Sequence, residues 1–329
     1  MRWWREAVWG RHRVLVSCAL ALVVVGVVCV AYVGVLWSRV NHLDVDLPGS
    51  RPGGVTYLFV GSDSRADLTT PFEQRRFGSI RGARADIMLL LRVPSDGSRP
   101  VLVSVPRDLL VIEPASAGGL RRLTLTWLDG PQATIDALCR SLGVGVDHLA
   151  EVNLKGFADV VDAVGGFDLT LPHALRDSGT LFSRSTPGTY HFNGSAALQY
   201  VRSRHLEQAT GPGEWVPVPN RRGEQARQVL SAVARNLHLS PLHPLAAYNL
   251  ASAATGALSI ESGAGLGDLR NLADAMRRVQ GAKDVQLPVH ITAAPIPFAE
   301  LKPGAGTVLR RVGGGGPGCP RAAFPEARP

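Results

Sequence analysis

The chain has 329 residues, 45% of them hydrophobic, which excludes an intrinsically disordered protein and allows one large or two small domains. Its 35 basic residues outnumber 27 acidic ones. Nearly all the basic residues are arginines, which GC-rich codon usage also favours, so their positions say more than the net charge of +8. No G-x-x-x-x-G-K, G-x-S-x-G, H-E-x-x-H or C-x-x-C motif occurs, which argues against a P-loop, a nucleophile elbow, a zincin and a cysteine-based zinc site.

A membrane anchor is expected near the N-terminus. The uncharged run of residues 14–37 has 24 residues, which at about 1.5 Å each cover the ~30 Å hydrocarbon core. Several arginines precede this run and two acidic residues soon follow it, so the positive-inside rule places residues 1–13 in the cytoplasm. We therefore expect a single-pass protein of the cell membrane, with residues 38–52 as a linker to an extracytoplasmic domain.

Apolar runs bounded by Gly, Pro and Asp predict buried strands in the first half of this domain. These runs are residues 55–60, 87–93, 101–105, 149–153 and 167–171. Helical spacing predicts helices over residues 132–142 and 157–164, the second ended by two glycines. The polar residues 66–83 are expected to form a loop.

The second half is predicted to be mainly helical. Asn193 can cap one helix, and a Pro/Gly-rich loop is expected over residues 209–219. Three more helices, over residues 221–239, 242–254 and 266–279, precede a last strand at 285–289. Gly and Pro dominate the end of the chain, so residues 301–329 are expected to be a disordered tail. Residues 53–300 are thus predicted to form one mixed α/β domain.

Short islands of acid and arginine stand at the ends of apolar runs. They are residues 61–65, 84–86, 106–108 and 202–204. If the strands are neighbours, Asp63, Asp86 and Arg107 converge at one edge of a sheet, where α/β folds present functional groups. Carboxylates with phosphate oxygens and water suit Mg²⁺, and arginine offers phosphate a planar, bidentate donor.

Each island alone has a simpler explanation as turn residues, capping residues, exposed loop charges or charges that compensate a helix dipole. Repetition on three successive strand ends favours a shared phosphate-handling site. A cation at the start of a helix opposes its dipole, yet arginines stand at 221 and 222. The candidate arginines are Arg65, Arg84, Arg107, Arg202, Arg204, Arg221 and Arg222.

In their order, these islands resemble the LytR-CpsA-Psr (LCP) family of bacterial cell-wall phosphotransferases. The resemblance spans about residues 53–295, and the expected N-terminal anchor agrees with it. No single motif is diagnostic, but the ordered set is specific. The segments that carry it are residues 61–65, 84–86, 104–108, 151–157, 161–166, 193–204 and 221–230.

The resemblance implies a three-layer α/β/α fold with a central mixed sheet and a hydrophobic pocket for a polyprenyl (pyro)phosphate. It implies transfer of a glycan phosphate from that lipid to peptidoglycan. Asp63 and Asp86 match the metal-associated acids of the family, for Mg²⁺ or Mn²⁺. The matching pyrophosphate-binding residues are Arg107, Arg202, Arg204 and either Arg221 or Arg222 with Gln225.

The chain also departs from the family pattern. Ile87 stands where the family usually has Thr, residues 122–124 replace a common Lys-Leu-Asn segment, and residues 219–220 lack the usual acid. These departures leave phosphate binding intact as an expectation. They make the choice of donor and acceptor less certain.

The mechanistic hypothesis is a metal-assisted attack by a sugar hydroxyl, with Asp63, Asp86 and Arg107 as the catalytic residues. Alternatives are a polyprenyl-pyrophosphate hydrolase, a lipid- or glycan-binding module without turnover, and a transcriptional attenuator. The short N-terminal arm cannot house a DNA-binding fold, so no nucleic acid partner is expected. Cys139 and Cys319 both lie in the external part, where a disulfide is permitted, and the sequence leaves their pairing open.

Overall fold

The structure is a computed structural model that describes residues 20, 23–24, 26–28, 30–63, 83–114, 119–203, 205–211, 213–218, 222–236, 244–292, 297–319 and 322–327. The chain divides into two compact units, Met1–Val40 and Asn41–Pro329. In the first unit, the described residues between 23 and 37 are helical. Within the described residues, no helix combines the length and the apolar character needed to cross a membrane. The expected cytoplasmic arm, part of the expected anchor and residues 66–82 of the expected loop lie outside the described part.

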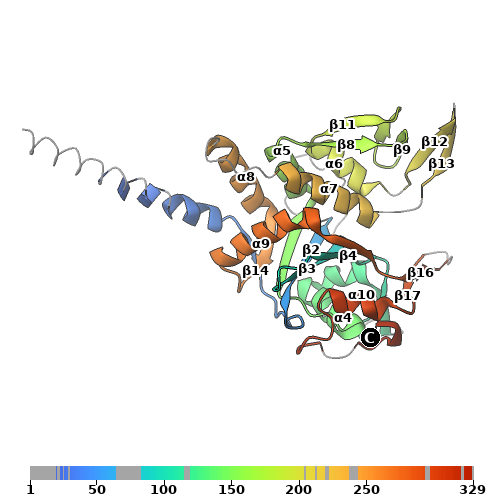
Figure 1. The fold of residues 1–329 in the computed structure, drawn as a ribbon, viewed down its shortest axis with the longest axis horizontal. Helices are drawn as coiled ribbons and strands as arrows, with labels where there is room; N and C mark the ends of the chain where they lie inside the picture. Colours follow the sequence, from blue (N-terminus) through green and yellow to red (C-terminus); the bar gives the residue numbers. More distant parts are fainter. Residues whose placement is uncertain are drawn as a thin grey trace, which may run out of the picture. The chain divides into compact units, whose positions relative to one another are not determined.

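A mixed seven-stranded sheet forms the centre of the second unit (Figure 1). Its strand order is β1-β14-β7-β2-β3-β4-β15, and β2 runs antiparallel to β3 and parallel to β7. The expected mixed α/β domain with a central mixed sheet is therefore confirmed. In sheet order the strands are Asn41–Leu43, Leu258–Glu261, His148–Asn153, Gly54–Ser62, Ala85–Pro94, Val101–Ser104 and Lys283–Gln286.

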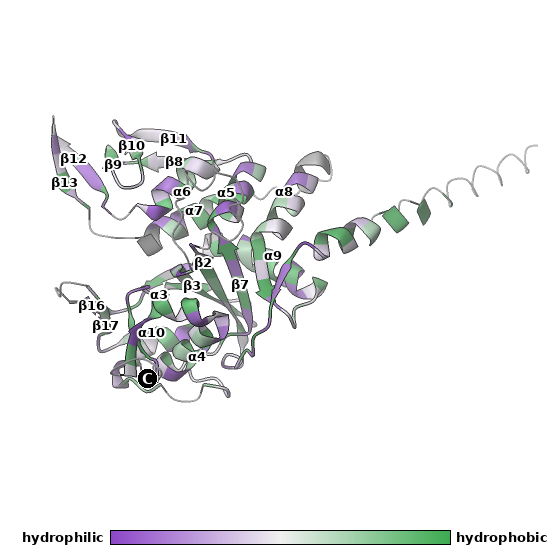
Figure 2. Ribbon diagram, turned by 180° about the vertical axis from the view of Figure 1, so that it is seen from behind, coloured by the Kyte–Doolittle hydropathy of each residue, from purple (hydrophilic) through white to green (hydrophobic). Residues whose placement is uncertain are grey.

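Helices pack on both faces of this sheet because successive strand residues point in opposite directions. Leu58 and Val60 of β2 join a core cluster with α3, α4 and α10, whereas Tyr57 joins another with α9. The two central strands β2 and β3 are largely apolar along their length, as Figure 2 shows. The helices are α3 Leu123–Thr126, α4 Pro131–Leu142, α9 Leu266–Arg278 and α10 Ala305–Arg311.

A second core lies among helices α5, α6 and α7 and several short strands. Phe167 and Phe192 stack at its centre with ring centroids 5.5 Å apart. Beside it, α8 (Pro244–Ala257) packs on α5. The other elements are α5 Leu154–Ala163, β8 Phe167–Leu171, β9 Leu175–Asp177, β10 Phe182–Arg184, β11 Gly188–Phe192, α6 Gly194–Arg202, β12 Glu207–Gly211, β13 Glu214–Pro217 and α7 Arg222–Asn236.

Small two-stranded sheets complete the unit. They pair β5 Leu110–Ile112 with β6 Leu120–Arg122 and β16 Val289–Ile291 with β17 Ala299–Leu301. Three 3₁₀ turns cover Trp127–Asp129, Val279–Gly281 and Pro325–Ala327.

Two segments expected to be irregular contain strands. Residues 41–43, in the expected linker, form the edge strand β1, paired with β14. The expected loop of residues 209–219 is largely the β12–β13 hairpin, in which Ala209 pairs with Trp215. The Trp215 ring also lies 4.3 Å from the guanidinium carbon of Arg176. Cross-strand pairing and this cation–π contact outweigh the local effect of Pro and Gly.

The expected disordered tail is wrong, because residues 302–319 fold against the central sheet. Helix α10 buries Ala305, Val308 and Leu309 in the core of one sheet face. The glycines that suggested disorder are needed for close packing. Gly313 has φ +94°, and a Cβ on it would lie 2.5 Å from the Thr56 Oγ1 atom.

A buried arginine joins this tail to the start of the domain. Arg92 is 5% exposed and donates hydrogen bonds to Thr56 Oγ1 (3.0 Å) and to the carbonyl of Pro52 (3.2 Å). Thr56 Oγ1 in turn donates to the carbonyl of Val312 at 3.0 Å. Burial lowers the pKa of Arg92, while the Asp147 carboxylate opposes that change. The network therefore fixes the first and last segments of the domain together.

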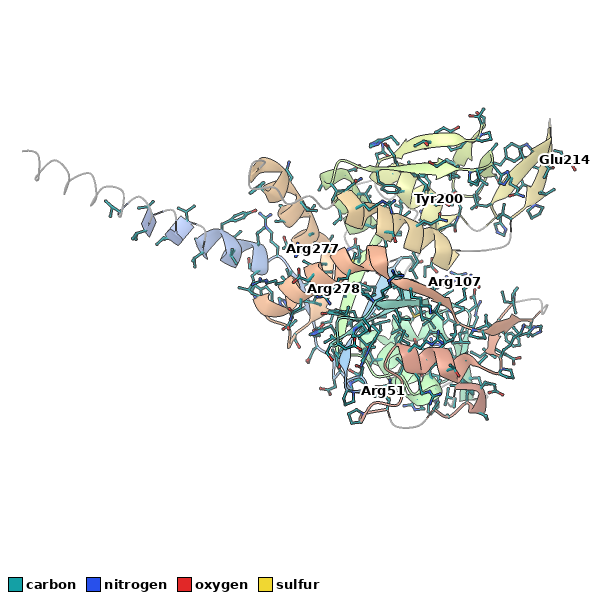
Figure 3. All side chains as sticks on the ribbon, in the orientation of Figure 1. Arg51, Arg107, Tyr200, Glu214, Arg277 and Arg278 are labelled. Atoms are coloured by element: carbon teal, nitrogen blue, oxygen red, sulfur yellow. A yellow bond between two sulfur atoms is a disulfide. The ribbon has the colours of Figure 1, made fainter. Side chains whose placement is uncertain are left out.

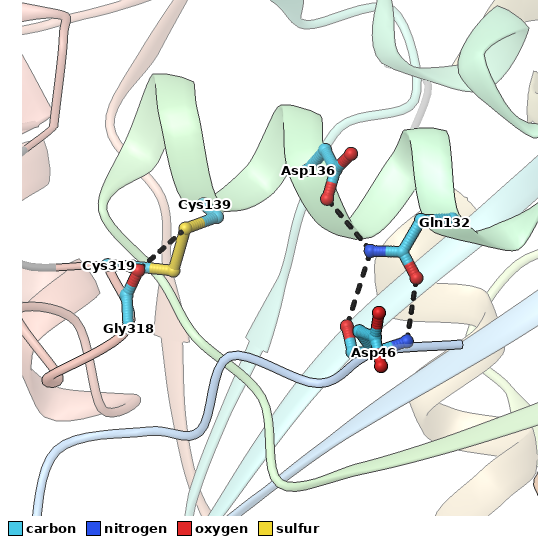
Figure 4. Close-up of a disulfide and its surroundings, with 6 residues drawn as sticks. All are labelled: Asp46, Gln132, Asp136, Cys139, Gly318 and Cys319. Carbon is cyan, nitrogen blue, oxygen red and sulfur yellow. Dashed lines mark hydrogen bonds between the residues drawn. A yellow bond between two sulfur atoms is a disulfide. The ribbon is translucent and has the colours of Figure 1, made fainter.

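Cys139 and Cys319 form a disulfide, which settles the pairing that the sequence left open (Figure 4). The bond joins α4 to the folded tail across 180 residues of sequence. On the same helix, Gln132 accepts a hydrogen bond from the Asp46 backbone N–H at 2.8 Å (Figure 4). Helix α4 is thus fastened to both ends of the domain.

We expect the paired substitution Cys139→Ser and Cys319→Ser to lower the free energy of unfolding by about 2–5 kcal/mol, because the disulfide closes a long loop. Guanidinium denaturation under non-reducing conditions measures this change. A reducing agent should destabilise the wild-type protein and leave the double variant unaffected. Equal stability of the two proteins without reductant contradicts a stabilising role.

Candidate active site

Three strand ends meet at one edge of the central sheet. Strand β2 ends at Ser62, which pairs with Ala85 at the start of antiparallel β3 and with Asn153 at the end of parallel β7. Asp63 follows Ser62 directly, and its backbone N–H donates to the carbonyl of Arg84 at 2.9 Å. The first two predicted islands therefore lie side by side.

A β-bulge sets the position of Asp86. Gly61 pairs with Ile87 and Ser62 with Ala85, so Asp86 is the extra residue between two successive pairs. Bulges redirect side chains and often occur beside active sites. The Asp63 carboxylate is also fixed, because its Oδ1 accepts a hydrogen bond from the Arg84 N–H at 2.6 Å.

Arg107 brings the third island to the same edge. Its Nη1 forms an ion pair with Asp86 Oδ1, and its Nε lies 3.3 Å from Asp108 Oδ2. The Arg107 and Asp86 side chains are 17% and 22% exposed, so solvent screens this pair only partly. Figure 3 shows Arg107 and, near the other end of β2, Arg51.

Arg122 joins this group, although the sequence did not select it as a site residue. Its Nη1 lies 3.6 Å from Asp108 Oδ1, so Asp108 stands between two guanidinium groups. The chain reaches this position because the Thr124 N–H donates to the Arg107 carbonyl at 2.8 Å. The sequence feature that points to Arg122 is the basic pair at residues 121–122. Such a pair is equally typical of a solvent-exposed turn.

Arg202 belongs to a helix of the second core. Arg202 lies in the last turn of α6 and is partly buried. Ile87, beside Asp86, packs against the core that contains Val201 and Ala226, so the sheet edge adjoins α6 and α7. Helix α7 begins at Arg222. Arg65, Arg204, Arg221 and the Arg222 side chain lie outside the described part of the chain, and their expected roles stay predictions.

Gln225 is the buried polar group on α7. It is 4% exposed, and neither amide atom has a hydrogen-bond partner among the described residues. Buried amides are nearly always paired, and an unpaired one carries a desolvation penalty. An amide left without a protein partner in this way fits a residue that binds a ligand.

The carboxylates at the sheet edge fit a hard divalent cation. No cluster of three or more His, Cys, Asp or Glu side chains suitable for a metal occurs among the described residues. Mg²⁺ needs no such cage, because it takes one or two carboxylates together with substrate phosphate oxygens and water. Asp63 and Asp86, on paired strand ends, provide that smaller set.

Comparison with known proteins identifies the family. Residues 38–290 match the model of the LytR_cpsA_psr family. The chain belongs to this family. Its fold matches the LytR-Csp2A-Psr enzyme from Actinomyces oris with a TM-score of 0.67 and 28% identity, over 84% of this chain and 96% of that one. The resemblance inferred from the acid–arginine islands is therefore confirmed.

Two curated relatives carry names that describe cell-wall synthesis. The probable cell wall biosynthesis protein LcpB of Corynebacterium glutamicum is 31% identical over 83% of this chain and 65% of its own length. The polyisoprenyl-teichoic acid–peptidoglycan teichoic acid transferase TagU of Bacillus cereus is 28% identical over 50% of this chain and 49% of its own. The chain thus spans less than two thirds of these relatives.

Gln225 gives a test in which stability and binding change in opposite directions. Replacing Gln225 with Met removes an unpaired buried amide, so we expect the free energy of unfolding to rise by about 1 kcal/mol. Binding of polyprenyl phosphate in detergent should weaken at least tenfold. Denaturation and a titration with that lipid measure the two effects.

The matched control is Gln228→Met on the same helix. Gln228 accepts a hydrogen bond from the Tyr200 hydroxyl at 3.0 Å, so this change should cost about 1 kcal/mol of stability. If Gln225→Met destabilises the protein as Gln228→Met does, the Gln225 amide has a structural role.

Proposed function

We propose that this protein is a phosphotransferase that moves a glycan phosphate from a polyprenyl-pyrophosphate carrier to peptidoglycan. The observation that carries the proposal is the Asp86–Arg107 ion pair beside Asp63, at a sheet edge that adjoins helices α6 and α7. Membership of the family and the name of the TagU relative support the same donor and acceptor classes.

The proposed reaction is a displacement at the glycan-linked phosphorus. A hydroxyl oxygen of the acceptor sugar forms a new P–O bond, and the bond from phosphorus to the bridging oxygen of the pyrophosphate breaks. Polyprenyl phosphate leaves with the electrons of that bond. The hydroxyl proton passes to a carboxylate, for which Asp63 is the candidate base.

Arginines stabilise the charge that develops during this displacement. Arg107 and Asp86 neutralise each other, so a phosphate that takes the Arg107 guanidinium leaves the Asp86 carboxylate available to a cation. A Mg²⁺ or Mn²⁺ ion held by Asp63 and Asp86 would add Lewis-acid polarisation of the phosphoryl oxygens. Arg202, Arg204, Gln225 and Arg221 or Arg222 are proposed to hold the rest of the pyrophosphate.

Transfer from a polyprenyl-pyrophosphate glycan to peptidoglycan, with the purified full chain in detergent, tests this site. Arg107→Ala and Asp63→Asn should each lower the rate at least a hundredfold, because each removes a group that acts on the reacting phosphate. EDTA should abolish transfer and Mg²⁺ should restore it. Arg310→Ala, on the outer side of α10, is the control that should keep full activity.

Retained transfer in Arg107→Ala would overturn the site assignment. Release of the glycan phosphate into solution, with no attachment to peptidoglycan, would instead identify a hydrolase in which water replaces the sugar hydroxyl.

We also propose that the N-terminal unit anchors the protein in the cell membrane, with the second unit on the extracytoplasmic side. Large apolar side chains on its helical residues are exposed, from 42% at Val33 to 74% at Val30. Figure 2 colours most of these residues as hydrophobic. Exposed apolar surface of this kind favours contact with lipid.

Membrane fractions that contain the full chain should release it with detergent and retain it in alkaline carbonate. Protease added to intact cells whose wall has been removed should digest the second unit. Release by carbonate would contradict an integral anchor.

A further inference from the structure

A cavity lies in the domain near the last turn of α7, whereas Gln225 lies in the first turns of that helix. The volume of the cavity is about 460 Å³, within the range of small-molecule sites. It is open to solvent and is lined by the turn between α5 and β8, by strand β11 and by the last turn of α7. The residues that matter for its chemistry are Gly165, Gly166, Asp168, His191, Arg235 and Asn236.

Backbone geometry builds one wall of this cavity. Gly165 and Gly166 have φ values of +81° and +73°, which other residues rarely adopt. A Cβ on Gly166 would lie 2.5 Å from the Nε2 atom of His191, so the imidazole lies directly against the glycine. The Asn236 side chain fixes the turn by donating from Nδ2 to the Gly166 carbonyl at 2.7 Å.

The side chains around the cavity offer both donors and acceptors. Arg235 is exposed, and no ion pair or hydrogen bond of its side chain occurs among the described residues. His191 Nδ1 lies 2.9 Å from Asp168 Oδ1 on the neighbouring strand. The Asn236 amide keeps its oxygen as an acceptor after donating to Gly166.

This set of groups fits one class of ligand. Carboxylate, amide and imidazole groups hydrogen-bond to the hydroxyls of a sugar, and the guanidinium pairs with a carboxylate or phosphate carried by that sugar. An apolar chain such as a prenyl tail would leave these polar groups desolvated without partners. The chemistry therefore selects an anionic saccharide.

The cavity also lies on the same helix as Gln225, a proposed pyrophosphate ligand. Arg235 follows Gln225 by ten residues on one helix, which places the two positions about 15 Å apart at the helical rise of about 1.5 Å per residue. A short oligosaccharide spans that distance.

We propose that this cavity binds an anionic sugar unit of one of the two glycans that meet in the reaction. The assignment to a reacting glycan rests on the proposed transferase function, whereas the binding of an anionic saccharide does not. The cavity holds the polymer at a distance from the reacting phosphate and so contributes to the choice of substrate.

Isothermal titration of the full chain in detergent tests the proposal with three soluble probes. The first is a muropeptide, which carries the carboxylates of the acceptor, and the second is N-acetylglucosamine 1-phosphate, which stands for the donor. The third is chitobiose, which is neutral. We expect an anionic probe to bind at least tenfold more tightly than chitobiose. Tighter binding of the muropeptide would assign the cavity to the acceptor glycan, and tighter binding of N-acetylglucosamine 1-phosphate would assign it to the donor.

Arg235→Ala should weaken binding of the anionic probe at least tenfold, and Arg235→Lys should weaken it less. Arg270→Ala removes an exposed arginine of α9 and is the matched control that should bind normally. The proposal would be overturned if Arg235→Ala and Arg270→Ala bound the anionic probe with equal affinity. It would also be overturned if the wild type bound chitobiose as tightly as the anionic probes.

The same titration separates this inference from the proposed function. In an Arg107→Ala background, which lacks the proposed phosphate contact of the candidate active site, adding Arg235→Ala should still weaken binding of the anionic probe at least tenfold. If the wild-type protein shows no transfer but Arg235→Ala still loses binding of the anionic probe, the saccharide site is supported and the transferase function is wrong. If Arg235→Ala shows normal transfer and normal binding of the anionic probe, the saccharide site is wrong and the transferase function is unaffected.

Discussion

The pairing of β2 with antiparallel β3 on one side and parallel β7 on the other is the constraint on which the candidate site depends. It brings the end of β2, the start of β3 and the end of β7 to one edge of the sheet. The bulge at Asp86 belongs to the same constraint, because the register shift between Gly61 and Ser62 makes Asp86 the extra residue of β3. A slip of one residue would turn the acid away from Arg107.

Charge balance explains how such a site can exist before it binds phosphate. Asp86 and Asp108 each contact Arg107, and Asp108 also contacts Arg122, so no guanidinium of this group is left without an acid nearby. When a polyanionic substrate binds, its phosphate oxygens replace carboxylate oxygens around the guanidinium groups. These groups are therefore never a cluster of uncompensated positive charge. The amide of Gln225 differs from these charged groups: it is buried and has no hydrogen-bond partner among the described residues.

Much of this arrangement could be predicted from sequence, because strand patterns and the residues at strand ends are local features. The convergence of Asp63, Asp86 and Arg107 at one sheet edge is predicted in this way, and their catalytic roles stay predictions. Arg122 was not predicted, since its place depends on a contact between Thr124 and the Arg107 backbone that no local pattern encodes. The tail was misread for the same reason. A glycine-rich composition around Gly313 predicts disorder. The structure shows instead that Thr56 and Arg92 pack against this glycine.

The closure of the domain by its last segment has a consequence for biosynthesis. The ribosome releases every candidate site residue well before it releases Val312 and Cys319, which bond to Thr56 and Cys139. The part of the sheet face that α10 covers therefore stays exposed until residues 302–319 have been synthesised. A prematurely terminated chain carries the full set of site arginines on an open core, where proteases can remove it. Order of synthesis thus makes closure of this core depend on the last folded segment that the structure describes.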